Sequence, residues 1–491
     1  RYNHPRIGNS YPPIQRVARR HRVCPFELSL ELALWSDLVI CDYNHGLDPR
    51  SGLKRLGVED RGGCTFLVDE AHNLVDRSRR MFSARLRKRR FFSLRRALVR
   101  DRTSPAGDGS ELLARSAGRI NDWLAKTRRR LERGDLPAAD REAPHDLYPL
   151  LREFAEEAER QLALAARIEP PGPGGSLPNF KELLDLYFEV AWFLKTAEQY
   201  DENYATCRET KNGNFSLMLF CLDPAPRVEE ALTRCRSAVF FSATLTPMQY
   251  FERVFGLTQT AQRLVLPSPF PAGNHCLLIY DGISTRYRDR TDTASAVARA
   301  LTIFVSARPG NYLFFFPSYL YLAMVHQHFC RPSPPAEIIM QTPAMAEEER
   351  EAFLEKFSEQ QKGTCVGFSV MGGVFGEGID LVGERLTGAV VVGVGLPGIC
   401  PERELIADHF QQQEGKGFDY SYRYPGIQRV LQAAGRVIRS ENDRGAVLLI
   451  GDRFSRFSYR RLLPREWNPV RVGSERAVSM ALDRFWGSTG F

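Results

Sequence analysis

The sequence contains no long uninterrupted apolar run and no paired cysteine motif. Its 491 residues include 10 cysteines, which are scattered and never form Cys-x-x-Cys. This spacing argues against a disulfide framework and against a self-contained zinc site. No apolar stretch is long enough to cross a bilayer, and the first residues show no signal-peptide pattern. We therefore expect a chain with no membrane partner, located in the reducing cytoplasm.

The overall composition is that of a folded protein with several domains. Hydrophobic residues make up 43% of the chain and charged residues 26%, which is ordinary for globular proteins. A chain of this length has room for about two to four domains. The formal net charge of +8 modestly favours a polyanionic partner, because lysine and arginine displace counterions from phosphates.

Short apolar runs bounded by turn residues recur along the chain and alternate with helical patterns. Such runs indicate parallel strands that are covered on both faces. We expect strands at residues 38–41, 66–68, 238–241, 277–280, 312–316, 365–370, 389–392 and 446–450. The fold class predicted is α/β, with two parallel sheets on either side of about residue 258.

Residues 73–210 have a different character from the rest of the chain. Strand-like runs are missing there, and arginine, leucine, alanine and glutamate dominate. Residues 181–200 have helical apolar spacing, while residues 170–178 read as a breaker or flexible loop. We interpret this region as a helical insertion between two strands of the first sheet.

Two adjacent carboxylates end the predicted strand at residues 66–68. Asp69 and Glu70 are followed by Ala71 and His72. A buried strand that ends in acids delivers them to a site at its carboxyl end. In nucleoside triphosphatases the first acid helps to hold Mg²⁺ and the second can polarise the attacking water. An ordinary strand-to-helix turn with an acidic cap explains four residues equally well.

Two further segments follow predicted strands. The tetrapeptide from Ser242 to Leu245 carries two hydroxyls, which can form hydrogen bonds to the acids or to a bound phosphate. For this tetrapeptide alone, a helix N-cap is the better explanation. Residues 372–381 read GGVFGEGIDL. Glycines allow the backbone to approach a phosphate closely, but such loops also end strands for steric reasons.

The segment QAAGRVIR at residues 432–439 is the most informative single motif. Gln432, Arg436 and Arg439 recur at helical spacing, so we expect them on one helix face. Two arginines held together can stabilise charge on a transferring phosphate. A solvated basic face is the alternative, which Gly435 makes less favourable because glycine weakens a helix.

Taken in order, DEAH, SATL, FGEGID and QAAGRVIR resemble motifs II, III, V and VI of superfamily-two helicases. The finer resemblance, over nearly the whole chain, is to the XPD/DinG-type iron–sulphur helicases. The stretch from Cys24 to Glu27, followed by Tyr43 and Asn44, is similar to the one that carries the family's fourth cluster cysteine. The stretch from Phe315 to Tyr319 is similar to motif IV.

This resemblance implies two RecA-like parallel-sheet motor domains with an arch-like helical insertion in the first. Residues 1–72 would be the C-terminal part of motor domain 1, with the tail of the iron–sulphur region. Residues 73–210 would be the insertion, residues 211–258 the remainder of motor domain 1, and residues 259–491 motor domain 2.

The resemblance also implies an ATP-dependent DNA helicase that moves along single-stranded DNA, usually 5′ to 3′. Asp69 would associate with Mg²⁺, Glu70 would activate water, and Arg436 and Arg439 would reach the phosphates. The residues implied in coupling to DNA are His72, Ser242, Thr244, Ser318 and Tyr319. Those implied in nucleotide binding are Gly376, Glu377, Gly378, Asp380 and Gln432. The implied cofactors are ATP, Mg²⁺ and a 4Fe-4S cluster, and the expected protein is a monomer that binds single-stranded or forked DNA in repair.

The sequence departs from this family in two respects. The phosphate-binding loop Gly-x-x-x-x-Gly-Lys-Ser/Thr is absent, and Gly415-Lys416-Gly417 is no substitute. Cys24 lacks three partners for a cluster; from the residues alone a buried structural cysteine is the commoner outcome. Because the chain starts at Arg1, we expect the missing elements upstream and little ATPase activity without them. A degenerate nucleic-acid-binding scaffold is the alternative, and an RNA-directed or non-unwinding translocase is a third.

Basic residues are concentrated at residues 85–102, where nine of eighteen positions are Arg or Lys. Phe91 and Phe92 interrupt them. Basic charge with nearby aromatics can track and stack a single strand. A solvated helix face explains the pattern equally well.

Overall fold

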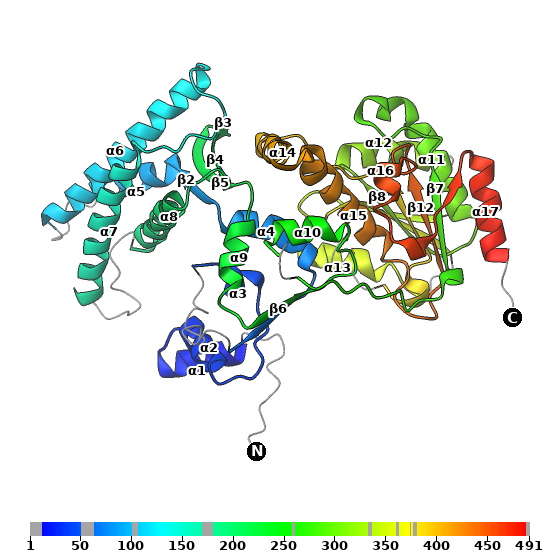
Figure 1. Cartoon of the computed structure of the whole chain (residues 1–491), viewed down its shortest axis with the longest axis horizontal. Helices are drawn as coiled ribbons and strands as arrows, with labels where there is room; N and C mark the ends of the chain where they lie inside the picture. Colours follow the sequence, from blue (N-terminus) through cyan, green and yellow to red (C-terminus); the bar gives the residue numbers. More distant parts are fainter. Residues whose placement is uncertain are drawn as a thin grey trace. The chain divides into compact units, whose positions relative to one another are not determined.

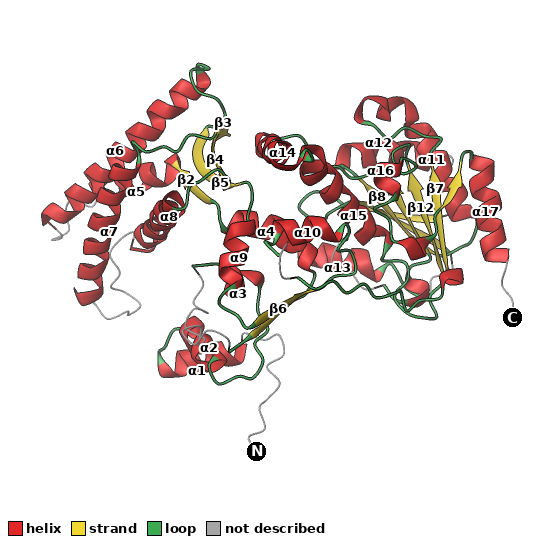
Figure 2. Cartoon of the chain, viewed as in Figure 1, coloured by secondary structure: helices red, strands yellow, loops and turns green. Residues whose placement is uncertain are grey.

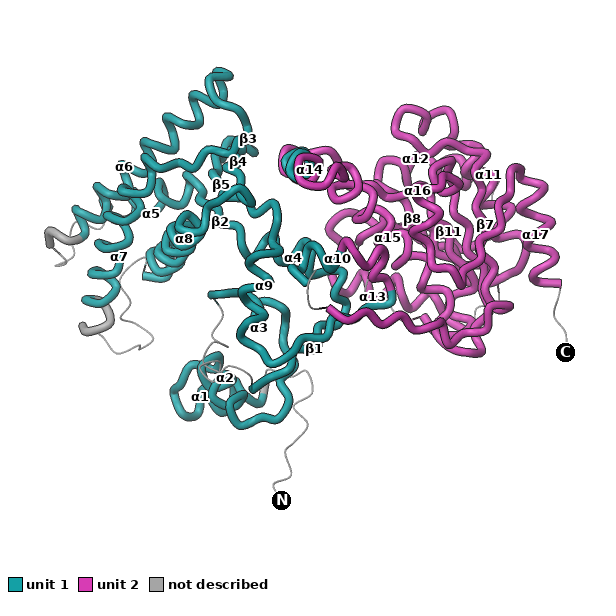
Figure 3. Tube along the Cα trace, in the orientation of Figure 1, with its two compact units in different colours: residues 1–243, 251–259, 404–409 teal, residues 244–250, 260–403, 410–491 magenta. Residues whose placement is uncertain are grey.

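The computed structural model describes residues 12–50, 63–100, 107–168, 180–257, 261–331, 336–359, 363–373, 375–376 and 381–487. The chain divides into two compact units (Figure 3). The first comprises residues 1–243, 251–259 and 404–409, and the second comprises residues 244–250, 260–403 and 410–491. No helix in the described part has the length and apolar character needed to span a bilayer.

The first unit contains a small parallel sheet made of two strands that are distant in sequence. Strand β1 (Thr65–Val68) pairs with β6 (Ser237–Phe240) in the register Thr65↔Ser237 to Val68↔Phe240. The helices of this part are α1 (Pro12–His21), α2 (Pro25–Ala33), α3 (Tyr43–Leu47), α4 (Leu74–Met81), α9 (Ala225–Leu232) and the last four residues of α10 (Met248–Val254), whose first three belong to the second unit. Both predicted strands, at residues 66–68 and 238–241, are confirmed with shifted ends.

The strand predicted at residues 38–41 is wrong. This stretch has irregular backbone, and Leu38 and Ile40 are 72% and 91% exposed. A strand needs a hydrogen-bonded neighbour, and among the described residues this sheet contains β1 and β6 alone. Cys41, expected in a buried strand, is therefore exposed.

The insertion in the first unit combines helices with an antiparallel sheet (Figure 1). Helices α5 (Lys88–Arg100), α6 (Gly107–Glu132), α7 (Tyr148–Ile168) and α8 (Phe180–Glu198) pack on a sheet of order β2-β5-β4-β3. Its strands are β2 (Ala84–Arg87), β3 (Ala139–Asp140), β4 (Tyr204–Lys211) and β5 (Asn214–Cys221). The sequence prediction contained only the helices, and its boundary at residue 210 falls inside the β4–β5 hairpin. The predicted loop at residues 170–178 lies outside the described residues.

The second unit is built on a seven-stranded sheet in which every pairing is parallel. The strand order is β13-β7-β12-β11-β8-β10-β9. The strands are β7 (His275–Tyr280), β8 (Asn311–Phe316), β9 (Ala336–Met340), β10 (Thr364–Val370), β11 (Gly388–Val392), β12 (Gly445–Ile450) and β13 (Val470–Val472). All five strands predicted after residue 258 are confirmed, whereas β9 and β13 were not predicted.

Helices cover this sheet, as Figure 2 shows. They are α11 (Arg290–Ser306), α12 (Tyr319–Cys330), α13 (Glu347–Glu355), α15 (Tyr424–Ala434), α16 (Phe457–Arg460) and α17 (Glu475–Gly487). Helix α14 (Pro401–Glu414) is divided between the two units, because residues 404–409 belong to the first. Helices α11, α12 and α17 share one apolar core with alternate residues of the central strands. Burial on both faces explains why these strands are continuous apolar runs.

Phe314 lies at the centre of this core. Its side chain is fully buried, and its ring meets those of Phe329 and Phe368 edge-on at centroid separations of 5.9 and 5.2 Å. We expect Phe314→Ala to lower the free energy of unfolding by about 3–5 kcal/mol, because it removes these contacts and leaves a cavity. Denaturant unfolding followed by circular dichroism measures the loss. Phe457, which is 81% exposed, provides the control: Phe457→Ala should change stability by less than about 0.5 kcal/mol, and equal losses would contradict this core.

Candidate functional site

The two carboxylates lie in a tight turn at the end of β1. Glu70 adopts left-handed backbone angles (φ 45°, ψ 43°), which a non-glycine residue takes only at a cost of about 1–2 kcal/mol. The Tyr43 hydroxyl donates to the carbonyl oxygens of Asp69 and Glu70, at 2.5 and 3.0 Å. The Glu70 amide donates to the Asp69 carboxylate at 2.7 Å. These bonds hold a strained turn that presents both acids.

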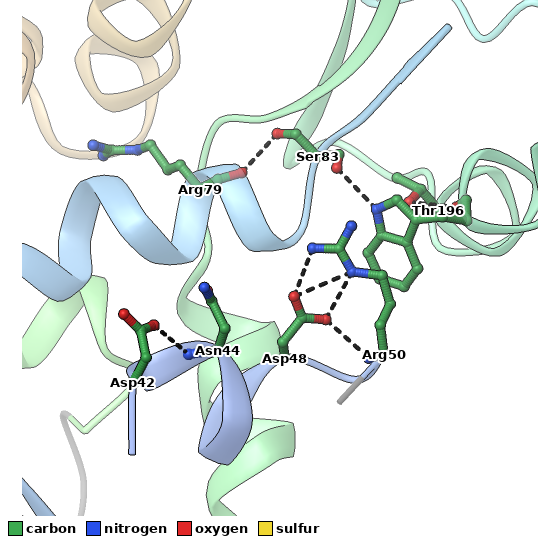
Figure 4. Close-up of polar contacts among 8 residues, drawn as sticks. Asp42, Asn44, Asp48, Arg50, Arg79, Ser83 and Thr196 are labelled. Carbon is green, nitrogen blue, oxygen red and sulfur yellow. Dashed lines mark hydrogen bonds and ion pairs between the residues drawn. The ribbon is translucent and has the colours of Figure 1, made fainter. Parts of the chain in front are cut away.

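Tyr43 is a site residue whose role the sequence did not reveal. Burial, together with the nearby Glu70 and Asp69 carboxylates, raises the pKa of Tyr43 to about 12. The phenol therefore keeps its proton and remains a donor to the turn. Asp42 caps α3, the helix that carries Tyr43, by accepting from the Asn44 amide at 3.0 Å (Figure 4).

The pairing of β1 with β6 brings Ser242 to the acid turn. The Ser242 hydroxyl donates to Glu70 Oε2 at 3.1 Å and lies 2.8 Å from His72 Nδ1. His72 Nδ1 is also 3.3 Å from the same Glu70 oxygen. The Ser242 hydroxyl has only one proton, and it donates that proton to Glu70. It must therefore accept from His72, so we assign the imidazole proton to Nδ1. We call Glu70, His72 and Ser242 the acid–serine–histidine triangle.

The triangle changes the interpretation of the tetrapeptide that begins at Ser242. The N-cap explanation is wrong for Ser242, because its hydroxyl contacts Glu70 and His72 instead of a helix terminus. Exposure differs sharply across the triangle: the His72 side chain is 5% exposed and that of Glu70 is 58% exposed. Glu70 can therefore meet a ligand from solvent while His72 is enclosed. Thr244 belongs to the second unit.

In the second unit, the glycine-rich segment and the arginine segment meet. Arg436 Nη2 donates to the carbonyl oxygen of Gly376 at 3.1 Å, and the Gly376 amide donates to Gly373 at 2.8 Å. The segments are 60 residues apart in sequence. Glu377, Gly378 and Asp380 lie outside the described residues.

The expectation that Gln432, Arg436 and Arg439 share one helix face is wrong. Helix α15 ends at Ala434 with Gly435 as its C-cap, so Arg436 and Arg439 lie in the turn and loop that follow. Asp443 stabilises this loop by accepting from the amides of Arg439 and Ser440, at 2.6 and 2.8 Å. Burial acts to raise the pKa of Asp443, but hydrogen bonds from Ser440 and these amides outweigh it and hold the pKa below its usual value.

Ser318 and Tyr319 follow β8 at the start of α12. The Ser318 hydroxyl accepts from the Tyr321 amide at 3.3 Å and so caps the helix. Tyr319 is the half-buried first residue of α12. The structure thus gives Ser318 a structural use, and its coupling role stays a prediction.

Cys24 is exposed and precedes α2. Among the described residues, no group of three or more His, Cys, Asp or Glu side chains is arranged to hold a metal ion. Cys41, the next cysteine along the chain, is exposed as well. The described residues therefore do not assemble a four-thiolate site.

The segment after α3 also contacts the root of the insertion. Figure 4 shows the Arg50 guanidinium beside Asp48, with Arg50 Nε 2.9 Å from Asp48 Oδ1. The same guanidinium lies 4.6 Å from the centroid of the Trp192 ring on α8. Trp192 Nε1 donates to the Ser83 carbonyl at 2.9 Å, and the Ser83 hydroxyl donates to the Arg79 carbonyl at 2.6 Å. These contacts join the support of the acid turn to the insertion.

Comparison with known proteins gives matches on both sides of the insertion. The DEAD_2 family model matches residues 11–91, and the helicase C-terminal domain model matches residues 301–470. The XPD subunit of the transcription and DNA repair factor IIH from Arabidopsis thaliana is 23% identical over 90% of this chain and 67% of its own length. The ATP-dependent DNA helicase DinG of Photobacterium profundum is 25% identical over 56% of this chain and 41% of its own. The chain belongs to the XPD/DinG-type helicases of superfamily two.

Other XPD/DinG-type proteins extend the likeness. A regulator of telomere elongation helicase 1 homologue from Aedes aegypti is 21% identical over 89% of this chain, which spans half of that protein. A solved XPD helicase covers 94% of this chain and matches 78% of its own, with a TM-score of 0.58 at 16% identity. Xpd4 of S. tokodaii covers 91% of this chain and matches 80% of its own, with a TM-score of 0.54 at 16% identity. These two structures show the shared fold.

The role of Tyr43 can be tested by removing its hydroxyl. We expect Tyr43→Phe to lower the free energy of unfolding by about 1 kcal/mol at neutral pH, because the turn loses a donor. The folded pKa of about 12 exceeds the ordinary value of 10.0, so this contribution is complete below pH 10 and is lost as pH rises towards 12. Denaturant unfolding of both proteins from pH 8 to 11 should show the difference shrinking above pH 10. The control Tyr287→Phe, at a side chain that is 80% exposed, should show no difference; a Tyr43→Phe gap that widens with pH would contradict the assignment.

Proposed function

We propose that this chain carries the motor elements of an ATP-dependent DNA helicase. The observation that supports this most is the acid–serine–histidine triangle. In it, the Glu70 carboxylate of the segment that resembles motif II accepts a hydrogen bond from Ser242, in the segment that resembles motif III. Membership in the XPD/DinG type supports the same activity. Because the chain spans about half the length of several relatives, activity, substrate and partners are all part of the proposal.

The acid turn suits Mg²⁺ and ATP. Carboxylate oxygens are the ligands that Mg²⁺ prefers, and Asp69 and Glu70 are adjacent at the end of a strand. Bound Mg-ATP would supply the phosphoanhydride whose hydrolysis drives movement. Asp69 would hold the metal, and Glu70, with its exposed carboxylate, would take a proton from the attacking water.

Ser242 and His72 would couple the nucleotide to DNA. The Ser242 hydroxyl donates to Glu70 and accepts from His72 Nδ1, so a change in the position or charge of Glu70 alters the bond to His72. ATP hydrolysis at Glu70 could in this way change the hydrogen bonds of Ser242, in the segment that follows β6. Thr244, Ser318 and Tyr319 are proposed to contact DNA or to relay this change.

The second unit would stabilise negative charge on the phosphates. Arg436 is anchored by one Nη atom to Gly376, and guanidinium groups stabilise charge on a transferring phosphoryl group. Arg439 would act beside it, and Gln432, together with residues 376–380, would bind the nucleotide.

The remaining parts of the proposal come from the relatives. The substrate would be single-stranded or forked DNA, and movement would be 5′ to 3′. The process would be DNA repair, in keeping with the name of the Arabidopsis thaliana relative. A 4Fe-4S cluster with Cys24 as one ligand, a monomeric state and a cytoplasmic location complete the proposal.

The role of Glu70 predicts a specific loss. In a form of the protein that hydrolyses ATP, Glu70→Gln should lower the rate of hydrolysis by about 10²–10⁴-fold, because the amide cannot accept the proton. Binding of a fluorescent ATP analogue should change little. Phosphate release and fluorescence titration measure the two effects. Glu198→Gln, the same change in the insertion, should alter neither, and full turnover by Glu70→Gln would rule out the proposed base.

The absence of the phosphate-binding loop from these 491 residues gives another expectation. Residues 1–491 alone should release little or no phosphate from ATP, because no Gly-x-x-x-x-Gly-Lys-Ser/Thr loop is there to cradle the triphosphate. A longer chain that adds such a loop to these residues should hydrolyse ATP in the same assay. Robust hydrolysis by residues 1–491 would place the nucleotide site elsewhere, and an inactive longer chain would favour a nucleic-acid-binding scaffold.

A further inference from the structure

A strongly basic pocket lies in the insertion of the first unit, apart from the acid turn. Its volume is about 440 Å³, within the range of small-ligand pockets. Strand β2, the start of α5 and the end of the β4–β5 hairpin line it; Figure 1 labels these elements. The charged residues that line it are Arg85, Arg87, Arg89, Arg90, Lys211 and Glu209. We call it the basic pocket.

Strand alternation explains how the sheet contributes to the basic pocket. Ala84 and Leu86 of β2 are buried in the core of the insertion, so Arg85 and Arg87 lie on the opposite face. Arg87 is paired in register with Ser216 of β5. The hairpin turns through Asn212 and Gly213, with φ of 50° and 73°, the conformation that an Asn-Gly pair favours in two-residue hairpins.

Helix α5 begins at this pocket with a charge pattern that folding alone disfavours. Its first three residues are Lys88, Arg89 and Arg90, and its first turn contains no acid. A helix N-terminus already carries partial positive charge and free amide groups, so cations there are unfavourable and anions are favourable. An anionic ligand bound here would offset the unfavourable positive charge at the start of α5.

Internal ion pairs neutralise the basic pocket only in part. Arg85 pairs with Glu209 at 3.0 Å. Arg87 and Arg90 share one carboxylate, Glu189, at 3.9 and 3.8 Å. Arg89 and Lys211 form no ion pair with any described residue. Five basic side chains thus face one lining carboxylate.

An aromatic ring lies next to this charge. Phe92, on the first turns of α5, is 49% exposed, and Lys88 Nζ is 5.8 Å from the centroid of its ring. Phe91, by contrast, is buried against Phe154 at a centroid separation of 5.7 Å. Only one of the two adjacent phenylalanines is therefore available for a ligand. Basic charge beside an exposed ring suits a nucleic-acid strand, whose bases can stack.

We propose that the basic pocket binds the phosphodiester backbone of single-stranded DNA. Guanidinium groups bind phosphate oxygens in pairs, and Arg89 and Lys211 are the side chains that the fold leaves available for this. The choice of DNA over another polyanion rests on the proposed function, whereas the anionic character of the ligand rests on the pocket. The contact is independent of ATP.

The test compares two double variants with the same loss of charge. Arg89→Gln with Lys211→Gln removes the two available cations. Arg96→Gln with Arg100→Gln removes two exposed arginines of the same helix that do not line the pocket. Binding of a labelled oligothymidylate to the chain is measured by fluorescence anisotropy at several salt concentrations. A charge-conserving double, Arg89→Lys with Lys211→Arg, reports whether the fold tolerates changes at these positions.

The pocket double should bind about tenfold more weakly near 0.1 M salt. Its slope of log affinity against log salt should be shallower by about 1.4, at about 0.7 for each lost phosphate contact. The Arg96/Arg100 double and the charge-conserving double should keep the wild-type slope. The pocket double should also raise the midpoint of thermal unfolding without DNA, since it removes a cation from the first turn of α5.

Four results would overturn the proposal. Equal flattening of the slope in both neutralised doubles would show a general effect of charge. Competition by poly-glutamate as effective as that by oligothymidylate would show that any polyanion binds. A wild-type slope in the pocket double would remove the pocket from the DNA path. Failure of the wild-type chain to bind any single-stranded DNA would overturn the proposed function as well, so the two failures are distinguishable.

Discussion

The parallel pairing of β1 with β6 is the contact on which the site in the first unit depends. It joins residues 172 positions apart, because Val68 pairs with Phe240 and Glu70 then lies beside Ser242. The whole insertion is the connection between these strands, and the entropy of closing a loop grows only slowly with its length. A slip of one residue would turn Ser242 away from Glu70. The register of four residue pairs therefore decides whether the triangle exists.

Burial explains which strands the sequence revealed. Strands β7, β8, β10, β11 and β12 are buried on both faces and read as continuous apolar runs. Residues 38–41 have the same composition but have no paired neighbour among the described residues, so composition alone predicted a strand that the structure lacks. Strand β2 reads Ala-Arg-Leu-Arg, with one polar face. Because it contains no apolar run and adjoins a basic helix, the sequence did not predict it.

The site shows a similar limit of local patterns. The acids, the serine and the histidine were all singled out from the sequence, but the contact that joins Ser242 to Glu70 and not to a helix terminus lies across the sheet. The supporting role of Tyr43 was not predicted because its hydroxyl acts on backbone carbonyls. The spacing of Arg436 and Arg439 suggested a continuous helix, whereas the loop is stabilised by Asp443, which also accepts from the distant Gly383 amide. Contacts of this kind cannot be inferred from residue spacing.

Helix α4 gives the acid turn a mechanical connection to the insertion. It begins directly after the turn at Ala71–Asn73 and ends two residues before β2 opens the antiparallel sheet. Leu74 and Met81, near its two ends, are buried, and Arg79 Nε donates to the Leu222 carbonyl just beyond β5. A helix of about two turns that is packed near both ends couples the position of its first residues to that of its last. A displacement of the acid turn would therefore also displace the start of the insertion.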